Sequence, residues 1–154
     1  MAIDVLIYEE GSGGEFTLVN DDLSLTNGLA NQVYLALFGG NLEQSTSLAL
    51  DELDTRSDWW GNVLLSEETQ FNSSFERALS EVTINSAGRA KLEAAAAQDL
   101  DYLKEYADIS LNSEVAGVNK LELYVTLQEP GKESIKIKLL WDGTRNEAII
   151  NVLL

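Results

Sequence analysis

Cysteine and histidine are both absent from this 154-residue sequence, and each absence removes a class of site. Without cysteine the chain has no disulfide, and without either residue it has no Cys/His zinc site. Nucleophilic systems built on a Ser–His or Cys–His pair are excluded for the same reason. What remains for chemistry within the chain is mainly its abundant carboxylates.

Basic residues are scarce, since 10 Lys and Arg stand against 26 Asp and Glu, and the formal net charge is −16. Such a chain repels phosphate backbones, which argues against nucleic-acid binding as its main activity. It is equally unsuited to an anionic membrane surface. The balance favours solubility and a basic protein partner.

Long apolar runs are also missing, so no segment is long enough to span a bilayer. Residues 1–10 lack a basic region and are interrupted by acids, so we expect no signal peptide there and expect folding in a cytoplasm. The hydrophobic fraction of 45% indicates a folded chain, and the length suits one core. We therefore predict a single domain over residues 1–154, with no cofactor.

The first third of the chain reads as strands followed by a helix. Alternation over residues 3–8 predicts a strand, and residues 16–19 predict a second strand that pairs with it as a hairpin across a Gly-rich turn. Leu23 and Leu25 suggest a short third strand. A helix is expected from Thr26 or Asn27 to about Phe38, ended by two glycines.

Two further helices are predicted in the middle of the chain. Ser73 and Glu76 fit a capping box that opens a short helix to about Glu81. Asn85 can cap a longer helix that runs to about Tyr106. We expect one face of this longer helix to enter the core through its regularly spaced apolar residues, namely Leu92, Ala96, Leu100 and Leu103.

The last third predicts an antiparallel sheet. Strands are expected near residues 109–111, over 120–128, over 134–141 and over 148–154, because apolar and polar residues alternate between strong turn signals. Lys136 and Lys138 are placed to meet Glu122 across the central ladder. The fold class is therefore α+β, with an N-terminal β-hairpin, central helices and a C-terminal antiparallel sheet.

One segment does not follow secondary-structure patterning, and it contains two adjacent tryptophans, Trp59 and Trp60, preceded by Arg56. Neighbouring residues point about 100° apart on a helix and to opposite faces of a strand, so the two indoles cannot share one small core stripe. Either one indole folds inward while the other lies on the surface, or one anchors a partner. Exposed Trp beside Arg is typical of protein-interaction hot spots.

Arg56, Trp59, Trp60, Gly61 and Asn62 resemble the Arg-x-x-Trp-Trp-Gly-Asp/Asn signature of the Mu-type phage baseplate family, which is related to contractile tail sheath initiators and baseplate wedge proteins. The resemblance covers most of the chain in layout and is specific near the Trp pair. It implies a structural virion component, assembled in the host cytoplasm into a multi-copy ring of a contractile tail baseplate. Implied partners are other wedge proteins and the tail sheath protein, with the tail tube as a further candidate. Asn62 replaces the more common Asp, which weakens a charge-based role at that position.

The last seven residues, 148–154, are apolar and β-prone, and two interpretations of the tail over residues 147–154 stay open. The segment either completes the chain's own sheet or pairs with another subunit as a strand-exchange tail. The resemblance favours the second, because sheath subunits interlock by exchanged terminal strands, and it implies that edge strands around residues 120–141 and the tail template the first sheath ring. The candidate interaction residues in this segment are Ile149, Ile150, Val152 and Leu153.

Two other functions are weighed against a structural one. A tail-associated peptidoglycan hydrolase would need a pair of carboxylates flanking the scissile bond, and Glu52, Asp54 and Asp58 near the indoles are the candidates. Nothing in their spacing marks a pair, so we expect no enzyme. These three acids and Asp51 could offer oxygen ligands for Ca²⁺, but they lack the spacing and the glycine of an EF-hand, and we expect no metal site. An acidic adaptor that binds a basic protein is the other alternative.

Overall fold

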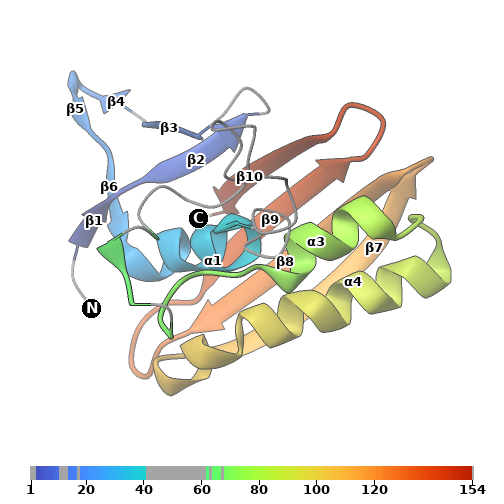
Figure 1. The fold of residues 1–154 in the computed structure, drawn as a ribbon. Helices are drawn as coiled ribbons and strands as arrows, with labels where there is room; N and C mark the ends of the chain where they lie inside the picture. The colour runs from blue at the N-terminus through green and yellow to red at the C-terminus, as the bar shows by residue number, and fades with distance from the viewer. Residues whose placement is uncertain are drawn as a thin grey trace.

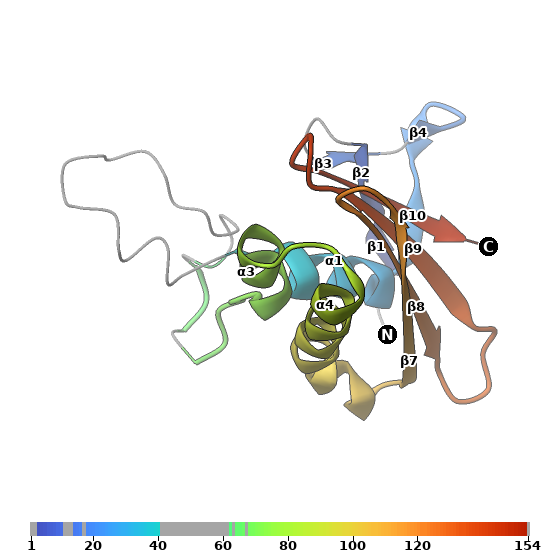
Figure 2. The same ribbon diagram turned by 90° about the vertical axis from the view of Figure 1, so that its right-hand side faces the viewer.

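The computed structural model describes residues 3–10, 14–16, 18–40, 62, 64–66 and 68–153. The predicted α+β class is confirmed: helices lie against one face of an antiparallel sheet (Figure 1). The main sheet has six strands in the order β3-β2-β10-β9-β8-β7. Seen along its edge, the helices all lie on one side of it (Figure 2).

The N-terminal hairpin is confirmed, but the strand predicted over residues 3–8 is divided. β1 (Ile3–Val5) pairs with β6 (Leu25–Asn27), whereas β2 (Ile7–Glu10) pairs with β3 (Gly14–Phe16) and with the C-terminal strand. The chain changes partner at Leu6, whose N–H donates to the Ser24 carbonyl. Between β3 and β6, β4 (Leu18–Val19) and β5 (Asp22–Leu23) form a second hairpin.

The helices begin where their capping residues predict. α1 (Gly28–Phe38) ends at the two glycines, and Gly40 adopts a φ of 122° that a side chain rarely tolerates. α3 (Ser74–Glu81) starts after Ser73, whose hydroxyl accepts from the Glu76 N–H. α4 (Ser86–Asp99) starts after Asn85, whose side chain accepts from the Gly88 N–H.

The prediction that this helix reaches Tyr106 is wrong at its end. The α-helix stops at Asp99 and continues after Leu100 as the 3-10 segment η2 (Asp101–Glu105). In 3-10 winding, residues three apart lie above one another, so Leu100 and Leu103 both stay in the core. Tyr102 faces outward, and its hydroxyl donates to Gln32 Oε1 at 2.9 Å.

Four long strands form the C-terminal part of the sheet. β7 (Asp108–Gly117), β8 (Lys120–Gln128), β9 (Ile135–Asp142) and β10 (Glu147–Leu153) pair in sequence order, each antiparallel to the next. β7 is longer than predicted. The predicted ladder contact is confirmed for Lys138, whose Nζ lies 2.8 Å from Glu122.

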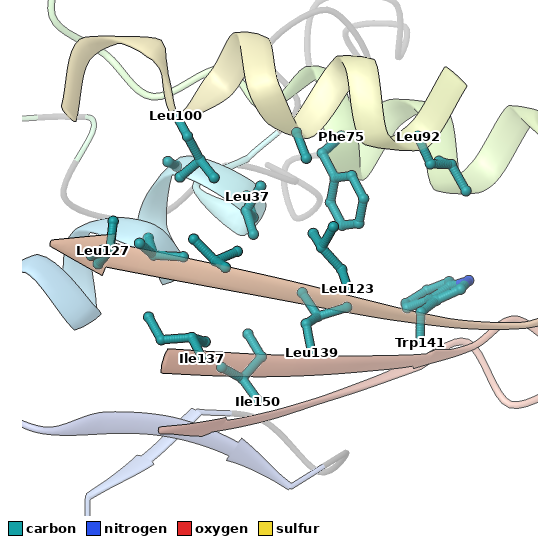
Figure 3. Packing of buried hydrophobic residues seen from close by; sticks show 14 of the residues in the cluster. Leu37, Phe75, Leu92, Leu100, Leu123, Leu127, Ile137, Leu139, Trp141 and Ile150 are labelled. Atoms are coloured by element: carbon teal, nitrogen blue, oxygen red, sulfur yellow. The ribbon is translucent and has the colours of Figure 1, made fainter. Parts of the chain in front are cut away.

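The core lies between the helices and this sheet. Side chains from alternate positions of β8 and β9 point toward α3 and α4, where Phe75 and Leu92 are fully buried (Figure 3). Burying each such side chain contributes on the order of 2 kcal/mol. The sheet's contribution to the core comprises Leu121, Leu123, Val125, Leu127, Ile137, Leu139, Trp141 and Ile150.

Candidate interaction sites

Arg56, Trp59 and Trp60, the predicted hot-spot residues, lie outside the described residues, as do Glu52, Asp54 and Asp58. The last residue of the same motif, Asn62, is described, and its side chain is completely buried. Its amide nitrogen donates to the Phe71 carbonyl at 2.8 Å and to the Gly39 carbonyl at 3.4 Å. Its amide oxygen accepts from the Phe71 N–H at 2.8 Å. Asn62 thus fastens the end of the motif to the end of α1.

The same place requires a glycine. A Cβ on Gly39 would lie 2.2 Å from the Leu35 carbonyl oxygen and 2.5 Å from the Phe71 Cβ. No real Cβ makes such contacts, so the close approach of Phe71 to the end of α1 depends on Gly39. Gln70 adds a further bond, from its amide nitrogen to the Asn62 carbonyl at 3.0 Å.

The capping box at α3 is only half formed. The Ser73 hydroxyl accepts from Glu76 N–H as predicted, but the Glu76 carboxylate does not return to the Ser73 N–H. Instead it accepts from the Gly40 N–H at 3.2 Å, and the Ser73 N–H donates to the Gly40 carbonyl at 2.8 Å. The bonds that would close the box within one helix here join α3 to Gly40, two residues beyond the end of α1.

These contacts meet at one place, which we call the α1–α3 junction; it consists of Gly39, Gly40, Asn62, Phe71, Ser73 and Glu76. Residues 40 and 62 are the two ends of the stretch that contains the Trp pair. Both described residues that flank positions 41–61, Gly40 and Asn62, are thus part of the junction.

Asp99 supports the junction from the end of α4. Its carboxylate accepts from the Phe75 N–H at 2.7 Å and from the Ser74 N–H at 3.0 Å, so it caps α3 from another helix. A carboxylate is favourable at the positive end of a helix dipole. Nevertheless burial raises the pKa of Asp99, and burial raises the pKa of Glu76 to about 7, with the nearby Asp99 charge adding to the shift.

These two carboxyl groups were not among the predicted site residues. Ser73 and Glu76 were visible as a capping box, but no spacing connects position 99 to a helix that starts 25 residues earlier. Their bonds to backbone N–H groups show what they do: they hold three helix ends together. Within the described residues, no cluster of three or more potential metal ligands occurs. None of the described helices is long and apolar enough to cross a membrane.

The four predicted residues of the C-terminal strand divide between the two faces of the sheet. Ile150 is buried in the core and Val152 packs against it, whereas Leu153 is exposed and Ile149 half-buried on the outer face. β10 pairs with β9 over all seven residues and with β2 at Ile149 and Ile150. The strand therefore lies inside this chain's own sheet.

The expectation that edge strands lie around residues 120–141 is wrong. β8 lies between β7 and β9, and β9 lies between β8 and β10, so both are interior strands. They are interior because β7 extends to Gly117 and covers β8, while β10 covers β9. The edges of the six-stranded sheet are β3 and β7.

β7 is the longer of the two edges, and one of its carbonyl groups has a side-chain partner. The Arg89 guanidinium on α4 donates to the Ser113 carbonyl at 3.1 Å and also contacts the Ser113 hydroxyl and Glu93. In an antiparallel ladder, backbone groups alternate between facing the neighbour and facing away. Since the Ser113 carbonyl faces away from β8, the backbone groups of Leu111 and Val115 face the same open side.

Comparison of the chain with protein-family models, with curated proteins and with solved structures finds no match.

Proposed function

We propose that this chain is a structural component of a contractile phage tail baseplate, a wedge or sheath-initiator protein that presents a β edge on which sheath subunits assemble. The observation that carries the proposal is the Arg56-to-Asn62 motif, which resembles the signature of that family. Asn62, the last residue of this motif, is buried and hydrogen-bonds through its side chain to the backbone of Phe71.

The mechanism is geometric. β7 offers ten residues of edge strand, with outward N–H and C=O groups at alternate positions. A strand from another subunit can add to such an edge through main-chain hydrogen bonds. α4 packs behind β7, and Arg89 on α4 hydrogen-bonds to Ser113 on β7, so the helix fixes the position of the edge.

Arg56, Trp59 and Trp60 dock a neighbouring wedge protein in this proposal. Aromatic residues and Arg carry most of the binding energy at protein interfaces, so two indoles and a guanidinium suffice for one contact. The sheath protein and the wedge protein then occupy different surfaces, and many copies of the chain form a ring.

The test is particle assembly with Val115→Pro and, as its matched control, Val115→Ala. Val115 is exposed, and by alternation its N–H faces away from β8, so proline removes an outward donor and places a ring on the edge without breaking the ladder. Mass spectrometry of purified contractile particles should find the wild-type chain as a low-copy tail component. Val115→Pro should yield tails without sheath, and Val115→Ala should yield complete tails.

Two results would overturn the proposal. If the wild-type chain is absent from particles, the family assignment is wrong, and salt-sensitive binding to a soluble basic protein would then favour the adaptor. If the Val115→Pro chain is folded and gives complete tails, β7 is not the edge that the sheath uses.

We propose no catalytic role. Among the described residues, Glu76 and Asp99 are the carboxyl groups with raised pKa values, and both accept hydrogen bonds from backbone N–H groups that hold helix ends in place. A turbidity assay on bacterial cell walls checks this. Clearing that disappears when one of the candidate acids, Glu52, Asp54 or Asp58, is changed to its amide would favour the hydrolase instead.

A further inference from the structure

The β4–β5 hairpin exposes apolar side chains that the proposed β7 edge does not account for. We call residues 18–25 the arm. It stands at the periphery of the molecule in both views, away from α3 and α4 (Figures 1 and 2). The exposed fractions are 65% for Leu18, 54% for Val19, 43% for Leu23 and 62% for Leu25.

The arm contains a short two-stranded ribbon closed by a tight turn. Asn20 and Asp21 both adopt positive φ, 54° and 63°, as in the tight turns that match the twist of a two-stranded ribbon. Leu18 is paired with Leu23, and Val19 with Asp22. The Asp22 side chain accepts from the Leu23 N–H at 2.8 Å, which stiffens the turn locally.

Apolar side chains occur on both faces of the arm. Successive residues of a strand point to opposite faces, so the Leu18–Leu23 pair lies on one face and Val19 on the other. Isolated exposed apolar residues are normal on proteins, but four within eight residues mark an interaction surface. Three of them lie on the β4–β5 hairpin, and the fourth, Leu25, is the first residue of β6. A flat surface would cover one face only, so the geometry requires a groove that encloses the arm.

The charge of the arm indicates which side chains surround the groove on the partner. Asp21 and Asp22 are exposed at the tip of the arm, and the only basic residue in the first 76 positions is Arg56. A second copy of a chain with net charge −16 would add like charge at this contact. We infer that the arm inserts into an apolar groove with a Lys- and Arg-rich rim on a different protein.

Site-specific photocrosslinking in the source cell tests this inference. A benzoyl-phenylalanine is placed at position 18 or at position 19. The control position is 106, just after η2, where Tyr106 has the same exposed fraction as Val19. Positions 18 and 19 should crosslink to the same partner, through peptides that lie next to Lys or Arg, and Tyr106 should not. The experiment identifies the partner whether or not it belongs to a baseplate, so it is independent of the proposed function.

A double variant supplies the second readout. Leu18→Ser with Leu23→Ser should reduce the crosslink from position 19 at least tenfold while the circular dichroism spectrum stays unchanged. Crosslinks only between copies of this chain, a crosslink from one face alone, equal crosslinking from Tyr106, or none from position 18 would each overturn the inference. If the double variant fails to fold, the comparison of positions 18, 19 and 106 still decides.

Discussion

At the scale of single residues, Asn62 has the most specific chemical role among the described residues. Its side chain is fully buried, donates to two carbonyl groups and accepts from one N–H, and only an amide offers that combination. The sequence marked this position as a departure from the usual Asp of the motif. The structure shows why the amide fits here, since a carboxylate would face the carbonyl oxygens of Gly39 and Phe71.

Asn62→Asp should therefore destabilise the chain by about 2–4 kcal/mol at neutral pH, because it buries a charge among acceptors. A protonated carboxyl can donate one of the lost bonds, so the deficit should shrink as the pH falls toward 5. Urea unfolding of the wild type and the variant at neutral pH and at pH 5 measures the difference in the free energy of unfolding. Asn72→Asp, an exposed change one residue beyond Phe71, is the control. A deficit below 0.5 kcal/mol at both pH values would show that the junction adapts to the carboxylate.

Glu76 gives the junction a pH dependence. Its pKa rises from the ordinary value of 4.5 to about 7 because the carboxyl is buried. The folded chain thus binds more protons than the unfolded chain between these values, and the free energy of unfolding falls as the pH rises from 4.5 to 7. Above pH 7 the loss is complete and constant. The raised pKa of Asp99 acts in the same direction.

Glu76→Gln should remove this contribution, because glutamine still accepts from the Gly40 N–H and carries no proton to lose. At pH 8 the variant should be more stable than the wild type by about 1–2 kcal/mol, a figure reduced for partial solvent exposure. At pH 5 the two should be nearly equal. Glu81→Gln, an exposed change on the same helix, controls for the lower net charge. If the stability of Glu76→Gln changes with pH in the same way as that of Glu81→Gln, the pH dependence does not come from Glu76.

At the scale of elements, the sequence correctly predicted the helices and strands whose ends are marked by neighbouring capping and turn residues. Caps and turns identified α1, α3, α4 and the β8–β9 hairpin, because a side chain such as Ser73 or Asn85 bonds to its own helix. The division of the first strand at Leu6 and the length of β7 were missed, since both depend on which distant strand is the neighbour. The Asp99 cap was missed for the same reason. Of the predicted site residues, only the four in the C-terminal strand fall on described residues.

β10 shows how alternation divides a predicted site. Ile150→Ala should cost about 2–4 kcal/mol of stability, because it leaves a cavity beside Leu139 in the core. Ile149→Ala, one residue earlier and on the outer face, should cost under 1 kcal/mol. Thermal unfolding of the two variants compares a core position with a surface position on the same strand. Equal costs would mean that both faces of β10 are covered.

If the outer face also contacts another subunit, Ile149→Ala and Leu153→Ser should reduce incorporation into particles while leaving the thermal midpoint unchanged. Ile150→Ala cannot serve this purpose, because its effect on assembly would follow from its effect on folding. The four residues first grouped as one interaction segment are thus two sets with different expected phenotypes.

At the scale of the whole molecule, the interior position of β10 decides how a strand-exchange tail can be tested. Removing residues 147–154 deletes the strand between β2 and β9, takes Ile150 out of the core and leaves β9 without one of its neighbours. The truncated chain should therefore lose its cooperative thermal transition and aggregate through the uncovered β9 edge. Size-exclusion chromatography and circular dichroism of the isolated chain check this before any particle is made.

The alternative outcome is equally informative. A truncated chain that stays monomeric and melts cooperatively would show that β2, β9 and the core close without β10, and strand donation to another subunit would then cost the domain little. In that case, adding residues 147–154 as a separate peptide should restore the thermal midpoint of the wild type, since the peptide can occupy the position of β10 between β2 and β9. Loss of folding leaves β3 and β7 as the edges available to a partner, and retained folding adds the β9–β10 position to them, so this measurement decides which strands another subunit can extend.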